Sequence, residues 1–253
     1  MKRTTSTRAA APRATTKATP KASVRTATPR AARKATRKAG TRTFFSYYFW
    51  YFARPGRTFD ALRDDPRKAR MAALAMLIPS LGYTLMYTCA WFAGGAPSTV
   101  QPWIALPMAE YFKYDIFIAA PSMFLGWILA AGVVQLLAGI FSGAADKGTF
   151  EDTAAAVAFG IAVGTWASLV HDLTDGVLGV LGVINMREYE AALNGPTFWR
   201  GLLWTLYTIY ALWMAFLFTK GFRRAHRLGW APSVLLAVGA LVIYAGFFFV
   251  FNR

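Results

Sequence analysis

The sequence predicts an all-α polytopic membrane protein with five transmembrane helices, preceded by a disordered basic N-terminal tail. Three observations predict this class. The 253 residues are 56% hydrophobic, yet their formal net charge is +16. Residues 1–43 hold 13 of the 28 Lys and Arg residues and no acidic residue, whereas residues 44–253 hold 15 basic and 12 acidic residues. Five apolar stretches follow, each near or above the roughly 20 residues that a helix needs to cross a bilayer.

The tail, residues 1–43, consists mostly of Ala, Thr, Lys, Arg and Pro. It cannot bury enough apolar surface to offset the entropy of ordering, so we expect it to be disordered. Besides a solvated extension, three functions are open. The tail can contact anionic lipid headgroups or neutralise the phosphates of nucleic acid. It can also be a targeting peptide, although it lacks the amphipathic face that such peptides have.

Residues 44–70 form a juxtamembrane segment in which eight of the first nine residues are aromatic. The run is too short to span a bilayer, but Tyr and Trp favour the headgroup region. We expect Thr58 to cap a short helix that lies along the interface with Phe59 and Leu62 on one face. The alternative is that the aromatic run packs against the helices that follow. The residues expected to contact the membrane surface and anionic lipids are Lys34, Arg37, Lys38, Arg42, Trp50, Tyr51, Arg54 and Arg57.

The remaining chain, residues 71–253, is the predicted five-helix transmembrane domain. The predicted spans are residues 71–94, 116–140, 153–170, 197–219 and 230–251. The first, second and fifth spans contain no charged residue, and the fourth carries only Arg200. A water-soluble helical bundle would show polar faces with a period of 3.6 residues, and these stretches do not.

Residues typical of helix ends flank these spans. Asp65 and Pro66 predict an N-cap and a first-turn proline before the first span, and Pro232 similarly opens the fifth. Residues 149–152 (Thr-Phe-Glu-Asp) predict a capping box before the third span. Within that span, Gly160 and Gly164 form a small-residue pair, which we expect to permit close helix packing in the bundle.

The distribution of basic residues predicts the orientation of the chain. With the N-terminus in the cytoplasm, the cytoplasmic side receives 24 Lys and Arg residues and the opposite side receives four. Cytoplasmic segments of membrane proteins are enriched in Lys and Arg. Five spans then place the C-terminus outside.

The sequence gives no positive evidence for an enzyme, and no catalytic residue, cofactor or metal site is predicted. Ionisable residues within membranes usually mark functional sites. Here the one suggestive cluster is His171, Asp172 and Asp175, which we interpret as a solvated helix end rather than a metal site. Gln135, in the second span, is expected to form an interhelical hydrogen bond rather than to bind substrate.

The order of motifs along residues 50–250 resembles the Yip1 domain family. The first motif is Arg54-Pro55-x-x-Thr58-Phe59-x-x-Leu62-x-x-Asp65-Pro66, and the next are Ala96-Pro97 and Glu110-Tyr111-x-x-Tyr114, which leads to Pro121. The last motif is Lys147-Gly148-Thr149-Phe150-Glu151-Asp152. The resemblance implies a non-enzymatic membrane protein with a cytoplasmic N-terminus. In eukaryotic relatives it implies membrane trafficking with binding of prenylated Rab GTPases, but the Asp-Leu-Tyr-Gly-Pro stretch of those relatives is missing here.

The sequence therefore favours a membrane organiser or scaffold of the trafficking type that acts through its cytoplasmic face, with anionic lipids and a protein partner. One alternative is a membrane-tethered protein that binds nucleic acid through its tail. A second is a small-molecule transporter. We expect the cytoplasmic (inner) membrane in a bacterial host, which the missing Rab-associated stretch favours, and the Golgi or endoplasmic reticulum membrane in a eukaryotic one.

Overall fold

A computed structural model describes residues 42–97, 106–142 and 148–251, and all their regular structure is helical. The predicted tail lies outside these residues, apart from its last two. The short helices are α2 (Phe44–Ala53), α3 (Pro55–Arg63), the 3₁₀ turn η1 (Met108–Glu110), α6 (Phe150–Gly164), α7 (Trp166–Val180) and α8 (Met186–Asn194). The long helices are α4 (Lys68–Phe92), α5 (Tyr111–Phe141), α9 (Phe198–Ala225) and α10 (Trp230–Phe251).

Among the described residues, four helices are long and apolar enough to cross a membrane, namely α4, α5 with its preceding turn, α9 and α10. A fifth crossing results only if α6 and α7 together count as one span, because they are bent by 44° relative to each other. The expectation of one continuous helix over residues 153–170 is therefore wrong. The chain is an all-helical membrane protein with four or five spanning segments.

Two features of the structure account for the bend between α6 and α7. Gly164 ends α6, and sharp helix kinks commonly occur at small residues or where a side chain intrudes on the backbone ladder. The hydroxyl of Tyr48, from α2, donates a hydrogen bond to the carbonyl of Ala162 at 2.9 Å. The indole N–H of Trp166, the first residue of α7, in turn donates to the Tyr48 hydroxyl. A side chain about 115 residues away thus binds both sides of the bend.

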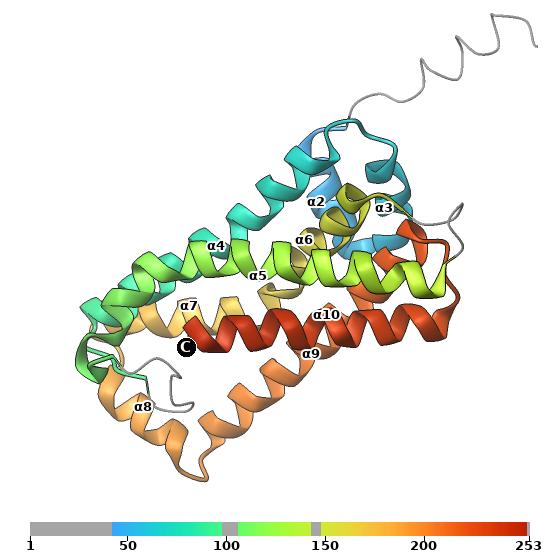
Figure 1. Ribbon diagram of the computed structural model, residues 1–253. Helices are drawn as coiled ribbons and strands as arrows, with labels where there is room; N and C mark the ends of the chain where they lie inside the picture. The colour runs from blue at the N-terminus through green and yellow to red at the C-terminus, as the bar shows by residue number, and fades with distance from the viewer. Residues whose placement is uncertain (1–41, 98–105, 143–147, 252–253) are drawn as a thin grey trace, which may run out of the picture. The chain divides into compact units, whose positions relative to one another are not determined.

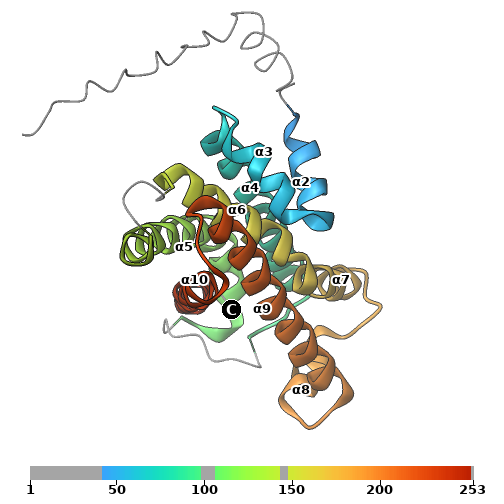
Figure 2. The same ribbon diagram turned by 90° about the vertical axis from the view of Figure 1, so that its right-hand side faces the viewer.

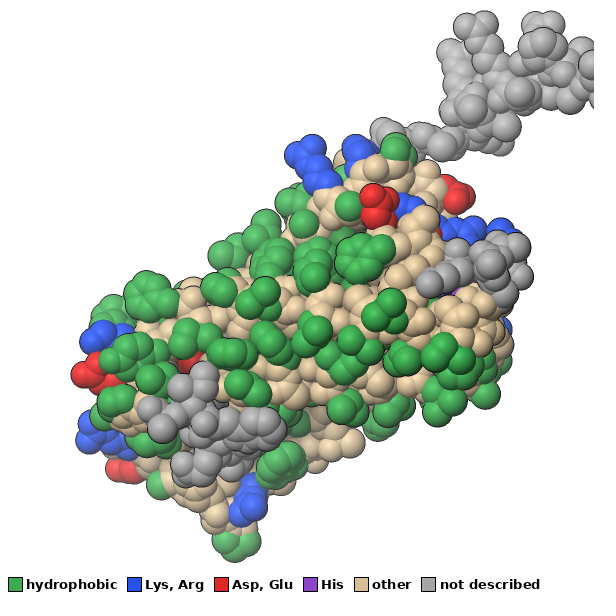
Figure 3. Space-filling view, in the orientation of Figure 1, with side chains coloured by type: hydrophobic (Ala, Val, Ile, Leu, Met, Phe, Trp, Pro, Cys, Tyr) green, Lys and Arg blue, Asp and Glu red, His purple; other side chains and the backbone are tan. Residues whose placement is uncertain are grey.

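The described helices have two opposite ends, which we call the α2–α3 end and the α8 end (Figures 1 and 2). Space-filling side chains are largely hydrophobic over the middle of the visible face, whereas Lys, Arg, Asp and Glu gather toward the two ends (Figure 3). This separation suits a bilayer, because charged side chains are costly at its centre.

Several predicted helix boundaries differ from the observed ones. Helix α4 begins at Lys68 with Arg67 as its N-cap, so Asp65 is not the cap. Helix α5 begins five residues before the predicted span and includes Lys113 and Asp115, whose side chain is fully buried. His171, Asp172 and Asp175 are not a solvated helix end, because α7 continues to Val180 and their side chains are largely buried.

Small residues let α6 lie close to its neighbours. A Cβ atom on Gly160 would lie 2.5 Å from Cδ1 of Phe218, and one on Gly164 would lie 3.2 Å from Cβ of Met214, both on α9. On the α9 side, a Cβ on Gly221 would lie 2.8 Å from Cβ of Ala156. Helices in membranes associate through such close backbone approach, because lipid provides no hydrophobic driving force.

We predict that Gly160→Ala destabilises the protein by about 1–3 kcal/mol, the range for inserting a methyl group into a well-packed core. The Phe218 ring is fully buried and stacks on Phe222, so it cannot move aside. The matched control is Gly239→Ala on α10, where no atom lies within 4 Å of the added Cβ. There Ala is expected to be neutral or slightly stabilising. Thermal unfolding in detergent measures both, and equal melting temperatures would contradict the proposed close packing.

Candidate membrane-interface site

Helix α2 has two faces that separate its aromatic residues. Tyr47, Tyr48 and Tyr51 are buried in the core, whereas Phe45 and Phe49 are about two-thirds exposed. Residues three or four apart lie on the same face of a helix, which explains the separation. One face of the aromatic run therefore packs against the bundle, as one interpretation predicted, and the other face presents an apolar outer surface, for which contact with the membrane stays a prediction.

Helix α3 attaches to the bundle through apolar side chains. Phe59 and Leu62 are fully buried on one face, as predicted. Thr58 is not the cap of this helix, because α3 begins at Pro55, a residue suited to the first helical turn. The Thr58 hydroxyl instead donates to the carbonyl of Arg54 at 2.9 Å.

The Asp65 side chain, which follows α3, links α2 to the start of α4 through hydrogen bonds. Its carboxylate accepts hydrogen bonds from the backbone N–H of Arg67 at 2.9 Å and from the Arg67 guanidinium at 3.0 and 3.1 Å. The Tyr47 hydroxyl donates to the same carboxylate at 3.1 Å. The Arg67 guanidinium, assisted by these other donors, holds the pKa of Asp65 below its ordinary value of 3.8. Burial, together with the bond to Asp65, raises the pKa of Tyr47 to about 12.

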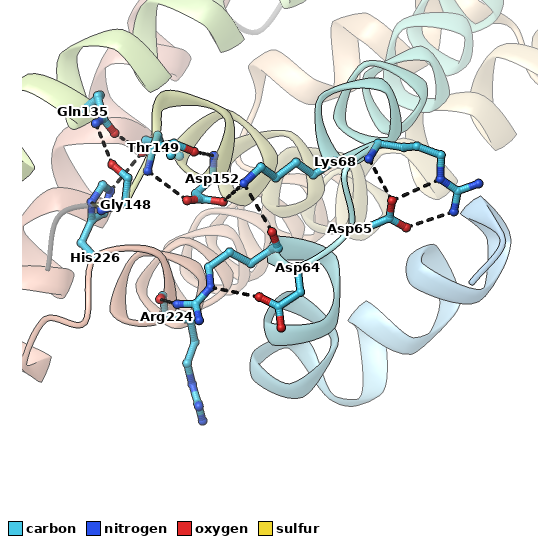
Figure 4. A network of polar contacts seen from close by, with 12 residues as sticks. Asp64, Asp65, Lys68, Gln135, Gly148, Thr149, Asp152, Arg224 and His226 are labelled. Carbon is cyan, nitrogen blue, oxygen red and sulfur yellow. Dashed lines mark hydrogen bonds and ion pairs between the residues drawn. The ribbon is translucent and has the colours of Figure 1, made fainter. Parts of the chain in front are cut away.

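A closed ring of hydrogen bonds surrounds Gly148 where α5, α6 and α9 meet (Figure 4). The N–H of Gly148 donates to Nδ1 of His226 at 3.2 Å, so the ring proton is on Nε2, which lies 3.0 Å from the hydroxyl of Thr153. This hydroxyl donates to Oε1 of Gln135, whose amide nitrogen donates to the Gly148 carbonyl at 2.9 Å. Gln135 thus makes the interhelical hydrogen bond that we expected.

The start of α6 connects this ring to α4. The predicted capping box is present, because Thr149 and Asp152 each bond the other's backbone N–H. Asp152 also forms an ion pair with Lys68 at 2.6 Å, and this pair is largely buried. Lys68 in addition donates to the carbonyl of Arg63 at the end of α3. The polar layer of Figure 4 therefore holds the short surface helices in a fixed position on the spanning helices.

Five cations meet in a hollow of about 510 Å³ between the start of α3 and the end of α9. We call it the basic groove. Its lining residues are Arg54, Pro55, Gly56, Arg57, Phe216, Lys220, Arg223 and Arg224. Arg224 forms an ion pair with Asp60 at 3.0 Å, which fixes one side of the groove. The excess of positive charge makes the groove suited to an anion.

Aromatic rings position the cations of the groove. The Lys220 ammonium lies 4.4 Å, and the Arg223 guanidinium 4.1 Å, from the centre of the Trp230 ring at the start of α10. The Arg54 guanidinium lies 5.3 Å from the centre of the Trp50 ring. Such contacts attract a cation to the face of the ring. Trp is also enriched at membrane interfaces, so the same rings are suited to the headgroup region.

The structure brings some of the predicted lipid-contact residues together and separates others. Arg54 and Arg57 line the basic groove, and Trp50 is half-exposed beside it. Arg42 instead lies near Arg67, whose guanidinium donates to its carbonyl. Tyr51 corrects the prediction, because its side chain is fully buried against Phe159 and cannot reach a headgroup. Three further predicted contacts lie outside the described residues: Lys34, Arg37 and Lys38.

The family-motif residues are spread over the fold. Pro55, Phe59, Leu62, Asp65, Pro66, Gly148 and Phe150 lie at the α2–α3 end, and Glu110 and Tyr111 begin α5 at the other end, with Pro121 inside that helix. A side chain at Gly148 would collide with the carbonyl of Ala225, which explains the need for glycine. Tyr111 is buried, whereas Glu110 is exposed and pairs with Lys113 at 3.0 Å.

Sequence analysis missed the contributions of α9 to this site. Lys220, Arg223 and Arg224 were counted only as signals of orientation, although spacing of three and four residues places them on one helical face. His226 was missed entirely, because nothing in the local sequence indicates that it meets Gly148. Asp115 was also missed as a buried carboxylate, since the predicted span began one residue after it.

We predict that Asp65→Asn lowers stability at pH 7 by about 1–3 kcal/mol, because it weakens charge-assisted bonds to a buried group. A carboxyl with a lowered pKa stabilises the folded state above its unfolded pKa, and this contribution is lost as the pH falls through the folded pKa. The difference in unfolding free energy between the variant and the wild type should therefore become smaller below pH 4. The control is Asp64→Asn, whose side chain is 80% exposed. Thermal unfolding across pH measures the gap, and a pH-independent gap would contradict this role.

Comparison with known proteins identifies the family of the chain. A family model described as "Yip1 domain" matches residues 50–252, from the second half of α2 beyond the end of α10. No match was found among the curated proteins or the solved structures. The matched region contains the basic groove, the pair of Asp65 and Arg67, and the ring around Gly148. The resemblance seen in the sequence is therefore confirmed, and the chain belongs to the Yip1 domain family.

Proposed function

We propose that this protein is a non-enzymatic organiser of the membrane that acts through its cytoplasmic face. In this proposal, anionic lipid headgroups occupy the basic groove, and a protein partner binds the surface formed beside it by α2 and α3. The observation that carries the proposal is the convergence of five cations from two segments that are about 160 residues apart.

The surroundings of the basic groove favour a lipid as the source of the anion. Trp50 and Trp230 flank the cations, and Phe45 and Phe49 expose apolar rings on the outer face of α2. A cationic surface combined with apolar anchors is the usual arrangement for binding at a membrane interface. Each basic residue near an anionic surface adds on the order of 1 kcal/mol.

The proposed orientation places the α2–α3 end in the cytoplasm. Of the described basic residues, most lie at this end, and only Lys113, Arg187 and Arg200 lie toward the α8 end. Counting α6 and α7 as one bent span gives five crossings and an external C-terminus. We propose the cytoplasmic membrane if the host is bacterial, and the Golgi or endoplasmic reticulum membrane if it is eukaryotic.

Reporter fusions test this topology. Reporters placed after residues 225 and 253 should be active in the cytoplasm and outside it, respectively, because α10 alone separates them. A reporter at residue 1 serves as the cytoplasmic reference. A cytoplasmic C-terminus would contradict the five-span arrangement and would make α6 and α7 a re-entrant pair.

Lipid selectivity tests the basic groove. The full chain is placed in nanodiscs that contain phosphatidylcholine and phosphatidylglycerol, and the lipids retained by the protein are counted by native mass spectrometry. The double variant Lys220→Gln/Arg223→Gln should lower the preference for phosphatidylglycerol roughly thirtyfold, because two charges of about 1 kcal/mol each are lost.

The matched control is Arg187→Gln/Arg200→Gln, which removes two charges at the α8 end. It should leave the lipid preference unchanged. Equal losses in the two double variants would show that overall charge, and not the groove, selects the lipid. No loss in either variant would overturn the assignment of the groove to anionic headgroups.

A further inference from the structure

A second hollow lies at the opposite end of the described helices from the basic groove. Helices α9 and α10 are neighbours near the α2–α3 end, but α9 then runs toward α8 while α10 stays beside α5 (Figures 1 and 2). Between the separated parts lies a half-open cavity of about 510 Å³, which we call the α9–α10 cavity. Its volume is within the roughly 300–1,000 Å³ typical of sites for small molecules.

The mouth of the α9–α10 cavity is apolar and faces outward. Leu212 and Val242 line it and are each about two-thirds exposed, on helices that are long and apolar enough to span a membrane. In a bilayer these exposed side chains contact hydrocarbon. A ligand therefore enters from the lipid phase and carries at least one hydrocarbon chain.

The inner wall, formed by α7 and α8, carries a negatively charged cluster. Nδ1 of His171 lies 3.2 Å from a carboxylate oxygen of Asp172 and 3.2 Å from one of Asp175. The hydroxyl of Tyr189 donates to Asp175 at 2.6 Å. Glu190 adds a third carboxylate, which accepts a hydrogen bond from the backbone N–H of Ala96 at 2.6 Å.

The charged groups of this wall indicate the sign of the charge that a ligand would carry. Three carboxyl groups and one imidazole line this wall, so acidic groups outnumber the one basic group. Of the described residues that line the cavity, none is Lys or Arg. No group of three or more His, Cys, Asp or Glu side chains in the described part of the chain is arranged to hold a metal ion. A buried negative charge is stabilised by an organic cation that brings its own hydrogen-bond donors.

A polar group on another wall of the cavity also indicates that a ligand binds there. Tyr244, on α10, lines the cavity and is 2% exposed. Its hydroxyl makes no hydrogen bond within the described residues. Buried hydroxyls in native structures almost always have a partner, so a group that lacks one needs an explanation. A polar head group inside the cavity supplies the missing partner.

We propose that the α9–α10 cavity binds a membrane-dissolved amphiphile with a protonated amine, whose ammonium group lies against Asp172 and Asp175 and whose hydrocarbon chain lies between α9 and α10. An ammonium group carries three hydrogen-bond donors and no acceptor, which suits a wall of carboxylates. A fatty acid would bring a second negative charge, and a fatty alcohol would leave the excess charge unpaired. This inference does not rest on the proposed role of the basic groove.

A photoreactive tetradecylamine tests the proposal with the full chain in phosphatidylcholine nanodiscs. After illumination, the labelled peptides are identified by mass spectrometry, and unlabelled tetradecylamine, tetradecanol and tetradecanoic acid compete for the site. Labelling should concentrate on the cavity-lining parts of α9 and α10. The amine should compete at a concentration about tenfold lower than the alcohol, the difference expected for a hydrogen bond to a charged group. The acid should not compete.

Two pairs of variants complete the test. Asp172→Asn/Asp175→Asn should reduce labelling about tenfold, whereas Glu188→Gln, an exposed carboxylate outside the cavity, should not. Ala245→Phe narrows the cavity and should abolish labelling, whereas Val238→Phe on the lipid-facing side of α10 should not. Melting temperatures identify variants that fail to fold. Equal competition by amine and alcohol would overturn the proposal, as would labelling that Ala245→Phe leaves unchanged.

Discussion

The ring of hydrogen bonds around Gly148 is the interaction on which the arrangement of the helices depends. Where water is scarce, each buried backbone N–H and C=O needs a partner. Gly148 lies outside any helix, just before α6, so His226 and Gln135 bind its two polar groups and Thr153 joins them. This ring fixes α5, α6 and α9 relative to one another, and the adjoining pair of Lys68 and Asp152 fixes α4.

The two ends of the bundle differ because α6 and α7 differ. Helix α6 is rich in Ala and Gly and is buried along nearly its whole length, so its neighbours come close and the α2–α3 end is tightly packed. Beyond the bend, α7 directs α8 outward, and α9 follows it away from α10. A closed polar layer therefore lies before the bend, at the start of α6, and the open cavity lies beyond it, beside α7. Tyr48, which binds both sides of that bend, links the surface helices to it.

The electrostatic character of the two ends is opposite. At the α2–α3 end, cations from α3 and α9 gather beside Trp50 and Trp230, where an anionic leaflet would neutralise them. At the α8 end, carboxylates from α7 and α8 face an apolar hollow that opens to lipid. Both sites combine a charged wall with an apolar surface, so both suit ligands that are themselves amphiphilic. Their charges would favour head groups of opposite sign.

The sequence by itself determined the helical class, the positions of most spans and the capping box of α6, because hydrophobic length and helix-end signals act over a few residues. It also predicted the apolar face of α3, since Phe59 and Leu62 are three residues apart. Only the tertiary structure decided that the third span bends, because the bend involves a hydroxyl from Tyr48. The same holds for the hydrogen bond between Gly148 and His226 and for the meeting of Arg54 and Arg223 in the basic groove. These contacts join residues about 80 to 170 positions apart, and their pairing depends on how the helices pack, which no local pattern of residues encodes.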